Sequence, residues 1–318
     1  MTDPTAFFQQ LRPRLQGIAY RMLGSRAEAE ELVQDVWLRW HEAGQSEGAV
    51  IGNAEAWLVT VTTRLSIDRL RAAKARRAHY VGFWLPEPWL ELDALPPSSQ
   101  QDTPPTPEEQ LARADDISLA FLTLLERLTP EARAAFLLRE VFDADYAEVA
   151  QALGKSEAAC RQIISRARGQ LKAQRPRYQV PADTHYRLLA GFAEAARQGD
   201  FTRLQALLAE DAELISDGGG VVPSFGRVLA GAGRIARLYF AAWRRHALGR
   251  HRLRLEIVRM NGQWGLLRFI DGELESAQSL ETDGQRITRI HTQRNPEKLQ
   301  GLAAAWTAAV TRREAGTS

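Results

Sequence analysis

A strongly basic stretch near the middle of the chain has the residue types that bind nucleic acid. Seven basic residues and one acidic residue lie between Lys155 and Arg177. Lys and Arg side chains at this density can neutralise DNA phosphates and release their counterions, which makes the affinity depend steeply on salt. Charge alone leaves a second interpretation open, a solvated basic helix in an ordinary all-helical protein.

The residues around this stretch predict a helix-turn-helix. Asp145 and Glu148 can form a capping box on a short first helix, Gly154 can take the positive φ of the turn, and Ser156 can cap the second helix. The second helix has an expected buried stripe of Cys160, Ile163, Ile164 and Ala167. The residues predicted to contact duplex DNA are Ser156, Glu157, Arg161, Gln162, Ser165, Arg166 and Arg168. Of these, Arg161 and Gln162 suit base edges, whereas Arg166 and Arg168 suit phosphates.

Charge is strongly segregated along the chain, although 318 residues carry a formal net charge of only +2. A second basic block contains Arg64, Arg69, Arg71, Lys74, Arg76 and Arg77. No Lys or Arg lies between residues 78 and 112, where acidic residues accumulate. A single cysteine excludes an internal disulfide, and no Cys and His spacing suggests a metal site. With no apolar run near the roughly 20 residues of a membrane span, we expect a cytoplasmic protein without a cofactor.

The first segment, to about residue 80, predicts a helical unit. Apolar residues recur at helical spacing from Phe7 to Met22, and Ser25 with Glu28 predicts the start of a second helix. A loop is expected from His41 to Gly52, followed by a third helix capped by Asn53. The helices carry Trp37, Trp40 and Trp57, which are more often core residues than stacking platforms for bases.

A linker follows, because residues 81–110 contain seven of the chain's 14 prolines. Its first third is too apolar for a simple tether, and Trp84 and Leu85 are expected to bind another part of the protein. A second helical unit is predicted from Ile117 to about Arg175. From about Thr184, one helix and several alternating strands predict an α+β domain.

The two helical units resemble regions two and four of bacterial sigma factors of the extracytoplasmic-function (ECF) type. Residues 28–37 resemble the helix that binds core RNA polymerase, residues 57–68 resemble the promoter-melting helix, and residues 156–168 resemble the minus-35 helix. One departure is Thr63-Arg64, which stands where many relatives carry Arg-Asn, so the base preference at minus 10 stays open.

The third region resembles the SnoaL-like, NTF2-like fold, and the whole chain resembles a sigma subgroup with this extension. In that subgroup the linker carries Trp84-Leu-Pro-Glu-Pro88, the extra domain carries Asp217-Gly-Gly-Gly220, and the tail carries a motif matched here by Asn295 to Leu299. The resemblance implies regulatory contacts by Trp84, Leu85, Pro86, Glu87, Pro88, Asp217, Gly218, Gly219, Gly220, Asn295, Pro296, Glu297, Lys298 and Leu299.

The expected fold is therefore multidomain, with two all-α domains and a C-terminal α+β cone. The expected divisions are 1–80 for region two, 81–112 for the linker, 113–178 for region four, 184–299 for the SnoaL-like domain and 300–318 for a tail. The resemblance implies a transcription initiation factor regulated in cis by its C-terminal domain.

Core RNA polymerase and promoter DNA are the partners that the resemblance implies, with duplex minus-35 DNA and single-stranded minus-10 DNA. Polymerase contacts are expected from Glu28, Glu31, Leu32, Gln34, Asp35, Leu38 and Arg39. Minus-10 contacts are expected from Asn53, Thr60, Thr63, Arg64, Arg71, Arg76 and Arg77. In the family, the loop at residues 44–53 holds an extruded minus-10 base, and the acidic linker can occupy the polymerase channel.

Two other functions stay open at this point. An enzymatic C-terminal domain could use His251, His291, Asp217 or Asp271, although isolated His residues on strands are usually structural. A plain helix-turn-helix repressor would need neither a polymerase-binding helix nor an acidic linker. Asp217-Gly-Gly-Gly220 lacks the Lys-Ser/Thr of a phosphate loop, so we expect a tight turn there and no catalytic residue. A small-molecule ligand of this domain also stays open.

Overall fold

The computed structural model describes residues 4–45, 52–77, 80–90, 118–172, 180–249 and 251–316. The chain divides into two compact units. Unit 1 combines Met1–His79 with Leu122–Arg175, and unit 2 combines Tyr80–Phe121 with Pro176–Ser318. The described part of the linker, residues 80–90, thus belongs to the same unit as the C-terminal domain.

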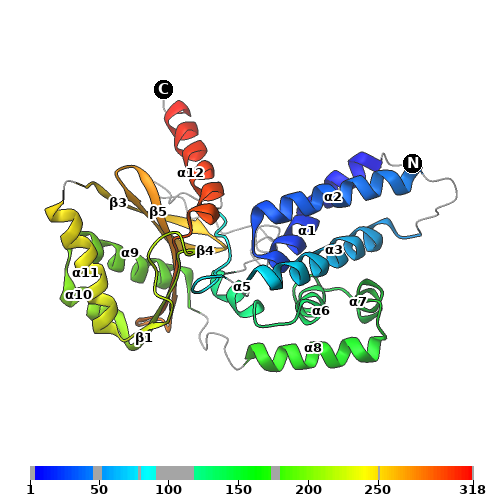
Figure 1. Cartoon of the computed structure of the whole chain (residues 1–318), viewed down its shortest axis with the longest axis horizontal. Coiled ribbons are helices and arrows are strands. Elements are labelled where there is room, and N and C mark those ends of the chain that lie inside the picture. Colours follow the sequence, from blue (N-terminus) through cyan, green and yellow to red (C-terminus); the bar gives the residue numbers. More distant parts are fainter. Residues whose placement is uncertain are drawn as a thin grey trace. The chain divides into compact units, whose positions relative to one another are not determined.

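Unit 1 is helical, as predicted (Figure 1). Its helices are α1 (Pro4–Leu23), α2 (Arg26–Gln45), α3 (Ala54–Arg77), α6 (Pro130–Glu140), α7 (Tyr146–Leu153) and α8 (Glu157–Lys172), and α5 (Leu119–Leu125) contains the division between the units. Helix α2 continues to Gln45, so the loop expected from His41 starts later than predicted because residues 41–45 extend the helix. Most of that loop, residues 46–51, lies outside the described residues.

The predicted helix starts are confirmed by hydrogen bonds. Ser25 Oγ accepts from Glu28 N at 3.3 Å, and Asn53 Oδ1 accepts from Ala56 N at 3.0 Å. Asp145 and Glu148 form a complete capping box on α7, and Gly154 ends that helix with φ 63°. These caps satisfy backbone N–H groups that a helix leaves unpaired at its start.

One buried arginine ties the helices of unit 1 together. The Arg133 guanidinium on α6 donates to the carbonyl oxygen of Met22 in α1 at 2.5 Å and to that of Leu125 at 3.0 Å. It also pairs with Glu126 at 2.7 Å. Because a buried cation is costly unless it is fully paired, these contacts fix α6 against the end of α1.

Unit 2 is an α+β domain built on one twisted sheet. Its elements are α9 (Ala182–Gln198), α10 (Phe201–Leu207), β1 (Leu208–Asp217), β2 (Leu229–Ala230), α11 (Ala232–Leu248), β3 (Leu253–Met260), β4 (Gln263–Ile270), β5 (Glu273–Thr282), β6 (Ile287–Gln293) and α12 (Pro296–Gly316). Among the described residues the sheet has the order β2-β1-β6-β5-β4-β3. Strands β1 and β6 pair in parallel, and the other neighbours are antiparallel.

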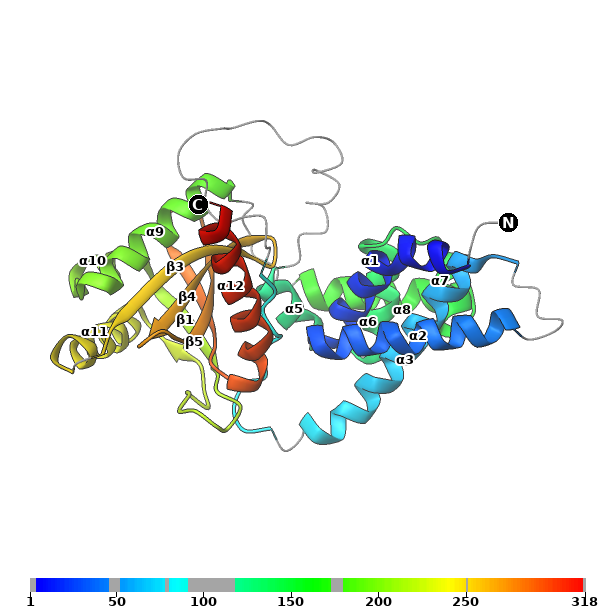
Figure 2. The same ribbon diagram turned by 90° about the horizontal axis from the view of Figure 1, so that it is seen from above.

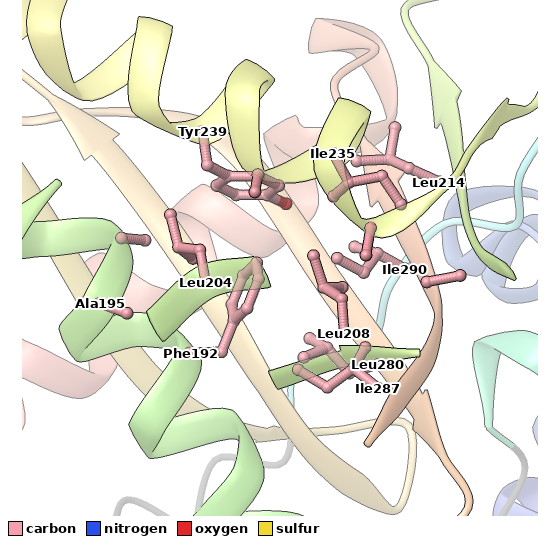
Figure 3. Packing of buried hydrophobic residues seen from close by; sticks show 14 of the residues in the cluster. Phe192, Ala195, Leu204, Leu208, Leu214, Ile235, Tyr239, Leu280, Ile287 and Ile290 are labelled. Atoms are coloured by element: carbon pink, nitrogen blue, oxygen red, sulfur yellow. The ribbon is translucent and has the colours of Figure 1, made fainter. Parts of the chain in front are cut away.

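Both faces of the sheet are covered by apolar side chains. One face packs against α9, α10 and α11, with Phe192, Leu204, Ile235 and Tyr239 in its core (Figure 3). Helix α12 lies on the other face (Figure 2). There α12 contributes Leu302 and Trp306, and the linker contributes Leu90. Helix α12 runs through residue 300 without a break, so it joins the segment expected as a tail to the motif that starts at Asn295.

Candidate functional site

The second helix of the helix-turn-helix presents its polar residues outward. Glu157, Arg161, Gln162, Ser165, Arg166 and Arg168 are all exposed, as is Ser156 before the helix, whereas Cys160, Ile164 and Ala167 are buried. Ile163 is only half-buried. The predicted division between a core stripe and an outward face is therefore correct for α8, apart from Ile163.

Two of the arginines on α8 already have partners within unit 1. The Arg161 guanidinium lies 4.6 Å from the ring centroid of Tyr146 and 2.9 Å from Glu157. Arg168 donates to both carboxylate oxygens of Glu140, at 2.6 and 3.0 Å. These contacts orient the guanidinium groups. Because the pairs are exposed to solvent, they contribute little to the free energy of unfolding of unit 1.

Helix α3 faces region four with residues that were expected to contact the minus-10 element. The Arg64 guanidinium donates to the carbonyl oxygens of Ala152 at 3.0 Å and Gln151 at 2.9 Å. A cation placed there stabilises the negative, C-terminal end of α7. Arg71 pairs with Glu131 of α6, which raises the pKa of Arg71 through that hydrogen bond and charge. The structure thus shows these two arginines bound to region four.

Thr63 was expected to contact minus-10 DNA, but it is not accessible to DNA in this arrangement of unit 1. Its side chain is 0% exposed, because Thr63 lies on the face of α3 that packs into the helical core. Thr60 and Asn53 instead line a polar crevice of about 120 Å³ together with Glu148 and Gln151. Arg76 and Arg77 stand in the last turn of α3, and their side chains lie outside the described residues.

The expected polymerase-binding helix α2 has a mixed exposed face. Glu31, Gln34, Leu38 and Arg39 are exposed, and Leu38 is the most apolar of them, with 57% of its surface exposed. Leu32, another expected polymerase contact, is 0% exposed and belongs to the apolar stripe of the same helix, so its side chain is not part of the exposed face.

Two acidic residues of this helix pair with Arg69, which was predicted only as part of a basic block. Its guanidinium lies 2.6 Å from Asp35 and 3.2 Å from Glu31. Asp35 and Glu28 are half-buried. The tryptophans near α2 are likewise half-buried and contact other rings, as in the Trp40–Trp57 pair at 5.7 Å and the Phe8–Trp37 pair at 4.9 Å.

Within unit 2, the linker motif lies on the C-terminal domain and converges on Asp217. The Asp217 carboxylate, at the end of β1, accepts hydrogen bonds from the Leu85 backbone N at 2.9 Å and from the Tyr80 hydroxyl at 2.6 Å. Gly219 N also donates to it at 2.9 Å. Burial, followed by the bond to Asp217, raises the pKa of Tyr80, so its hydroxyl keeps the proton that it donates.

Two further side chains hold the linker backbone. Lys298 Nζ donates to the Leu85 carbonyl oxygen and to Asp217 Oδ2, both at 2.7 Å, and lies 4.1 Å from the ring centroid of Trp84. Gln293 Nε2 donates to the carbonyl oxygens of Leu85 at 3.2 Å and Pro86 at 3.3 Å. We call Asp217, Gln293 and Lys298 with the bound residues 84–86 the linker clasp.

The three glycines after Asp217 allow close approach. Gly219 has φ +65°, and a Cβ there would lie 2.5 Å from Asn295 Cγ. A Cβ at Gly218 would lie 2.3 Å from the carbonyl oxygen of Val222. Gly220 has φ +74° and faces Val81 of the linker. The expected tight turn is confirmed, and only glycine fits its backbone without strain.

The remaining motif residues have mixed roles. Pro86, Glu87 and Pro88 are buried, and Glu87 approaches Gly301 of α12, where a Cβ would lie 3.2 Å from its Oε1. Asn295 donates to the Tyr80 hydroxyl at 3.0 Å and caps α12. Leu299 is buried in the second core. The expected regulatory contacts of Pro296 and Glu297 are not seen, because both are exposed in the first turn of α12.

Several residues that hold the linker on the C-terminal domain were not predicted from the sequence. Tyr80 lies four residues before Trp84 and Gln293 lies two residues before Asn295, so their closeness to the recognised motifs was a usable signal. Asn261 Oδ1 accepts from Trp89 N at 2.9 Å, and Asn261 N donates to the Trp89 carbonyl at 2.9 Å. Its Asn-Gly turn between β3 and β4 predicts only a hairpin, and nothing in the sequence assigns it a partner.

The candidate catalytic residues do not converge on one centre. His251 Nδ1 lies 2.5 Å from Asp271 in an exposed pair, and Asp217 is occupied by the linker clasp. His291 is buried in the sheet, where burial lowers its pKa to about 3. The described ranges contain no group of three or more His, Cys, Asp or Glu residues that could hold a metal ion. No described helix is long and apolar enough to span a membrane.

Comparisons with known proteins match this arrangement. Residues 7–76 match Sigma-70 region 2, and residues 118–171 match Sigma-70, region 4. The chain is 34% identical over 304 residues to the ECF RNA polymerase sigma factor SigJ of Mycobacterium tuberculosis, covering 92% of both chains. It is 29% identical over 303 residues to the probable ECF RNA polymerase sigma factor SigI of the same species, covering 95% of this chain and 97% of SigI.

The same relative has a solved structure. The crystal structure of the M. tuberculosis extracytoplasmic function sigma factor SigJ matches with a TM-score of 0.69 at 30% identity, and the match covers 93% of this chain and 98% of that chain. The match therefore includes both the helical regions and the α+β domain. The chain belongs to the extracytoplasmic-function sigma factors of the sigma-70 family, which are transcription initiation factors and not enzymes.

Proposed function

We propose that this sigma factor directs promoter-specific initiation and that its C-terminal domain regulates it in cis through the linker clasp. The observation that carries this proposal is the position of Lys298, which binds the Leu85 carbonyl and Asp217 at the same time. A polar cluster of this kind recognises the linker backbone, and its burial excludes competing water.

In this proposal the two DNA-binding helices have different tasks. Arg161 and Gln162 on α8 read base edges of the minus-35 element, and Arg166 and Arg168 bind phosphates. Arg64 and Arg71 on α3 bind phosphates near minus 10. The exposed face of α2 around Leu38 binds core polymerase.

Unit 1 as described must open before it can use both promoter elements. The elements are separated by about 25 base pairs, or about 85 Å at about 3.4 Å per pair. In unit 1, however, Arg64 of α3 contacts the end of α7 at 2.9 Å. The same two arginines that are proposed to bind DNA hold region four against region two, so promoter phosphates and region four compete for them.

The clasp is proposed to favour the inactive state. A segment whose Leu85 and Leu90 are buried on the C-terminal domain cannot at the same time lie extended in the polymerase channel. The domain shifts the balance between these two placements by the difference in its affinity for them. Release of the clasp should therefore increase transcription.

Run-off transcription with core polymerase on a promoter library tests the proposal. The wild-type chain should select a subset of promoters, and Lys298→Met should raise output from them at least about fivefold, a typical size for allosteric coupling. Arg312→Met, an exposed change on the same helix, is the matched control and should have no effect. Lack of any promoter-dependent product would contradict the initiation role. Unchanged output from Lys298→Met would contradict the regulatory role.

A further inference from the structure

We propose that the C-terminal domain has a binding site for a small monocarboxylate with an apolar body, in a cavity between α11 and the concave face of the sheet. The cavity has a volume of about 290 Å³. Its lining includes none of the linker-clasp residues, and none of the motifs found in the sequence points to it. Its lining combines an apolar wall, a neutral polar end and an excess of positive charge.

The apolar wall comes from three different elements. Leu238 and Ala242 contribute from α11, Leu214 from β1, and Phe225 from the loop between β1 and β2. A cavity of this size is at the lower end of the range for small-molecule sites and holds a ligand of about ten to fifteen heavy atoms. Burial of an apolar chain there would be favourable at about 25 cal/mol per Å².

The polar end consists of uncharged groups. The Tyr239 hydroxyl donates to Gln278 Oε1 at 2.8 Å, and both side chains are buried. Burial raises the pKa of Tyr239, so the hydroxyl is neutral. Ser216 and Ser276 are buried beside them and line the same cavity. Figure 3 shows Tyr239 projecting from α11 across the sheet, toward the strands that carry these side chains.

The charged groups of the cavity do not balance. Arg268 and Arg294 share the carboxylate of Glu275, with Nε to oxygen distances of 2.8 and 2.7 Å. Burial alone would raise the pKa of Glu275, but the two arginines lower it overall, so the carboxylate is ionised. Arg245 also lines the cavity from its exposed rim, and among the described residues no carboxylate forms an ion pair with it. Three cations and one anion leave a net charge of +2, which favours an anionic ligand.

The cavity and the linker clasp share one loop, so a ligand can affect the clasp. Pro223 and Ser224 of this loop line the cavity. The Arg294 side chain donates to the Pro223 carbonyl oxygen, and its backbone N donates to the Asp217 carbonyl oxygen at 2.7 Å. On the other side of the loop, a Cβ at Gly82 of the linker would lie 3.7 Å from Ser224 Oγ. This coupling rests on the proposed regulatory role of the clasp, whereas the binding site does not.

Ligand-observed NMR titration of the full chain tests the binding site with three probes of one chain length: octanoate, octanol and octylamine. We expect octanoate to bind at least about tenfold more tightly than octanol, because a charge-assisted bond to arginine adds about 1.4 kcal/mol or more. Octylamine should bind least. Arg245→Gln should remove most of the preference for octanoate, whereas Arg244→Gln, an equally exposed neighbour that does not line the cavity, should retain it.

A second variant tests the position of the site. Ala241 lies at the cavity and is exposed, so Ala241→Trp should fill the space without disturbing the core and should abolish octanoate binding. Equal binding of octanoate and octanol, or octanoate binding unaffected by Ala241→Trp, would overturn the proposal. So would the absence of octanoate binding. None of these results bears on promoter-dependent transcription, which is measured separately, so failure of the ligand site and failure of the sigma role can be told apart.

Discussion

Lys298 Nζ lies 2.7 Å from Asp217 Oδ2, and the side chains of this pair are 14% and 0% exposed. The pair joins the first turn of α12 to the end of β1, and the same ammonium binds the linker at Leu85. The Lys298 ammonium therefore links α12 and β1 to the linker. An ion pair as buried as this one has an asymmetric energetic effect: removal of one partner leaves the other charge buried without compensation.

Lys298→Met should therefore destabilise unit 2. We expect the free energy of unfolding to fall by about 3 kcal/mol, the lower end for a broken buried pair, because Asp217 retains other hydrogen-bond donors. Urea denaturation followed by the fluorescence of Trp84 and Trp89, with the other tryptophans replaced by Phe, measures this change. Arg312→Met should leave the midpoint unchanged. A loss below about 0.5 kcal/mol for Lys298→Met, within the range of ordinary surface changes, would mean that the pair is not important for stability.

The exposed face of α2 can be tested with one matched pair of substitutions. Leu38→Glu places a charge on the proposed polymerase contact, where an uncompensated buried charge should weaken binding to core polymerase at least about tenfold. Leu248→Glu makes the same chemical change at a site in unit 2 that is 81% exposed, and it should not affect binding. Pull-down with core enzyme measures both. Equal affinities of the two variants would remove α2 as the binding surface.

The two classes of arginine on α8 should behave differently on DNA. Arg161→Ala should cost about 1 to 3 kcal/mol at a specific minus-35 site and relax the sequence preference there. Arg166→Ala should weaken binding to specific and random duplexes equally and lower the salt slope by about one. Fluorescence anisotropy on both duplexes at several salt concentrations separates the two effects. Identical behaviour of the variants would show that the division of roles is wrong.

The stability of unit 2 should depend on pH through His291. Burial, with a smaller effect of Arg289, lowers the pKa of His291 to about 3. In the unfolded chain the pKa of the same imidazole is about 6.5. Below pH about 6.5 the unfolded state thus binds a proton that the folded state does not, and the free energy of unfolding falls by about 1.4 kcal/mol per pH unit. His185, whose pKa burial also lowers, acts in the same direction.

Hydrogen exchange of the β6 amides at pH 6.5 and pH 5.0 measures this effect. Burial raises the pKa of Glu281 despite Arg289, so protonation of Glu281 offsets part of the slope. The informative quantity is the difference between the wild-type chain and His291→Gln. We expect the wild type to lose up to about 2 kcal/mol more than His291→Gln over this range. Parallel slopes for the two proteins would contradict the assignment of a neutral buried histidine.

The local signals in the sequence predicted local structure well. Asp145, Glu148 and Gly154 determine the helix-turn-helix through hydrogen bonds and a backbone angle that involve only near neighbours, so the motif could be predicted without tertiary information. The burial of Leu32 and Thr63 could not be predicted in this way. Both lie on helices predicted correctly, but their expected contacts came from the family resemblance, whereas burial depends on how α2 and α3 pack.

The contacts of the linker clasp were also only partly predictable, because they depend on tertiary packing. The sequence indicated that Trp84 and Leu85 bind another part of the protein, and motif resemblance indicated Asp217 and Lys298. The sequence did not indicate Tyr80, Gln293 or Asn261, because none of them belongs to a recognised motif and each makes its contact with a residue more than 100 positions away. The cavity beside Tyr239 could not be predicted either, since its lining comes from α11, four strands and a loop.

A reversible disulfide across the clasp tests the regulatory role most directly. Val81 is 67% exposed, and a Cβ at Gly220 would lie 3.2 Å from its Cβ, close to the about 3.5 to 4.5 Å of a disulfide. The double variant Val81→Cys with Gly220→Cys can thus be closed by oxidation and opened by reductant. A Cys at the φ +74° of Gly220 is strained, and because both forms carry it, comparison of the oxidised and reduced forms cancels its effect. The native Cys160 is buried, and burial raises its pKa, so the wild-type chain is the control for oxidation.

Run-off transcription with the oxidised and reduced double variant is the decisive measurement. If the clasp holds the linker away from polymerase, the oxidised form should give at least about fivefold less product than the reduced form, and reductant should restore the output. The wild-type chain should respond to neither treatment. Equal output from the oxidised and reduced double variant, with the disulfide shown to be complete, would contradict regulation through the linker clasp.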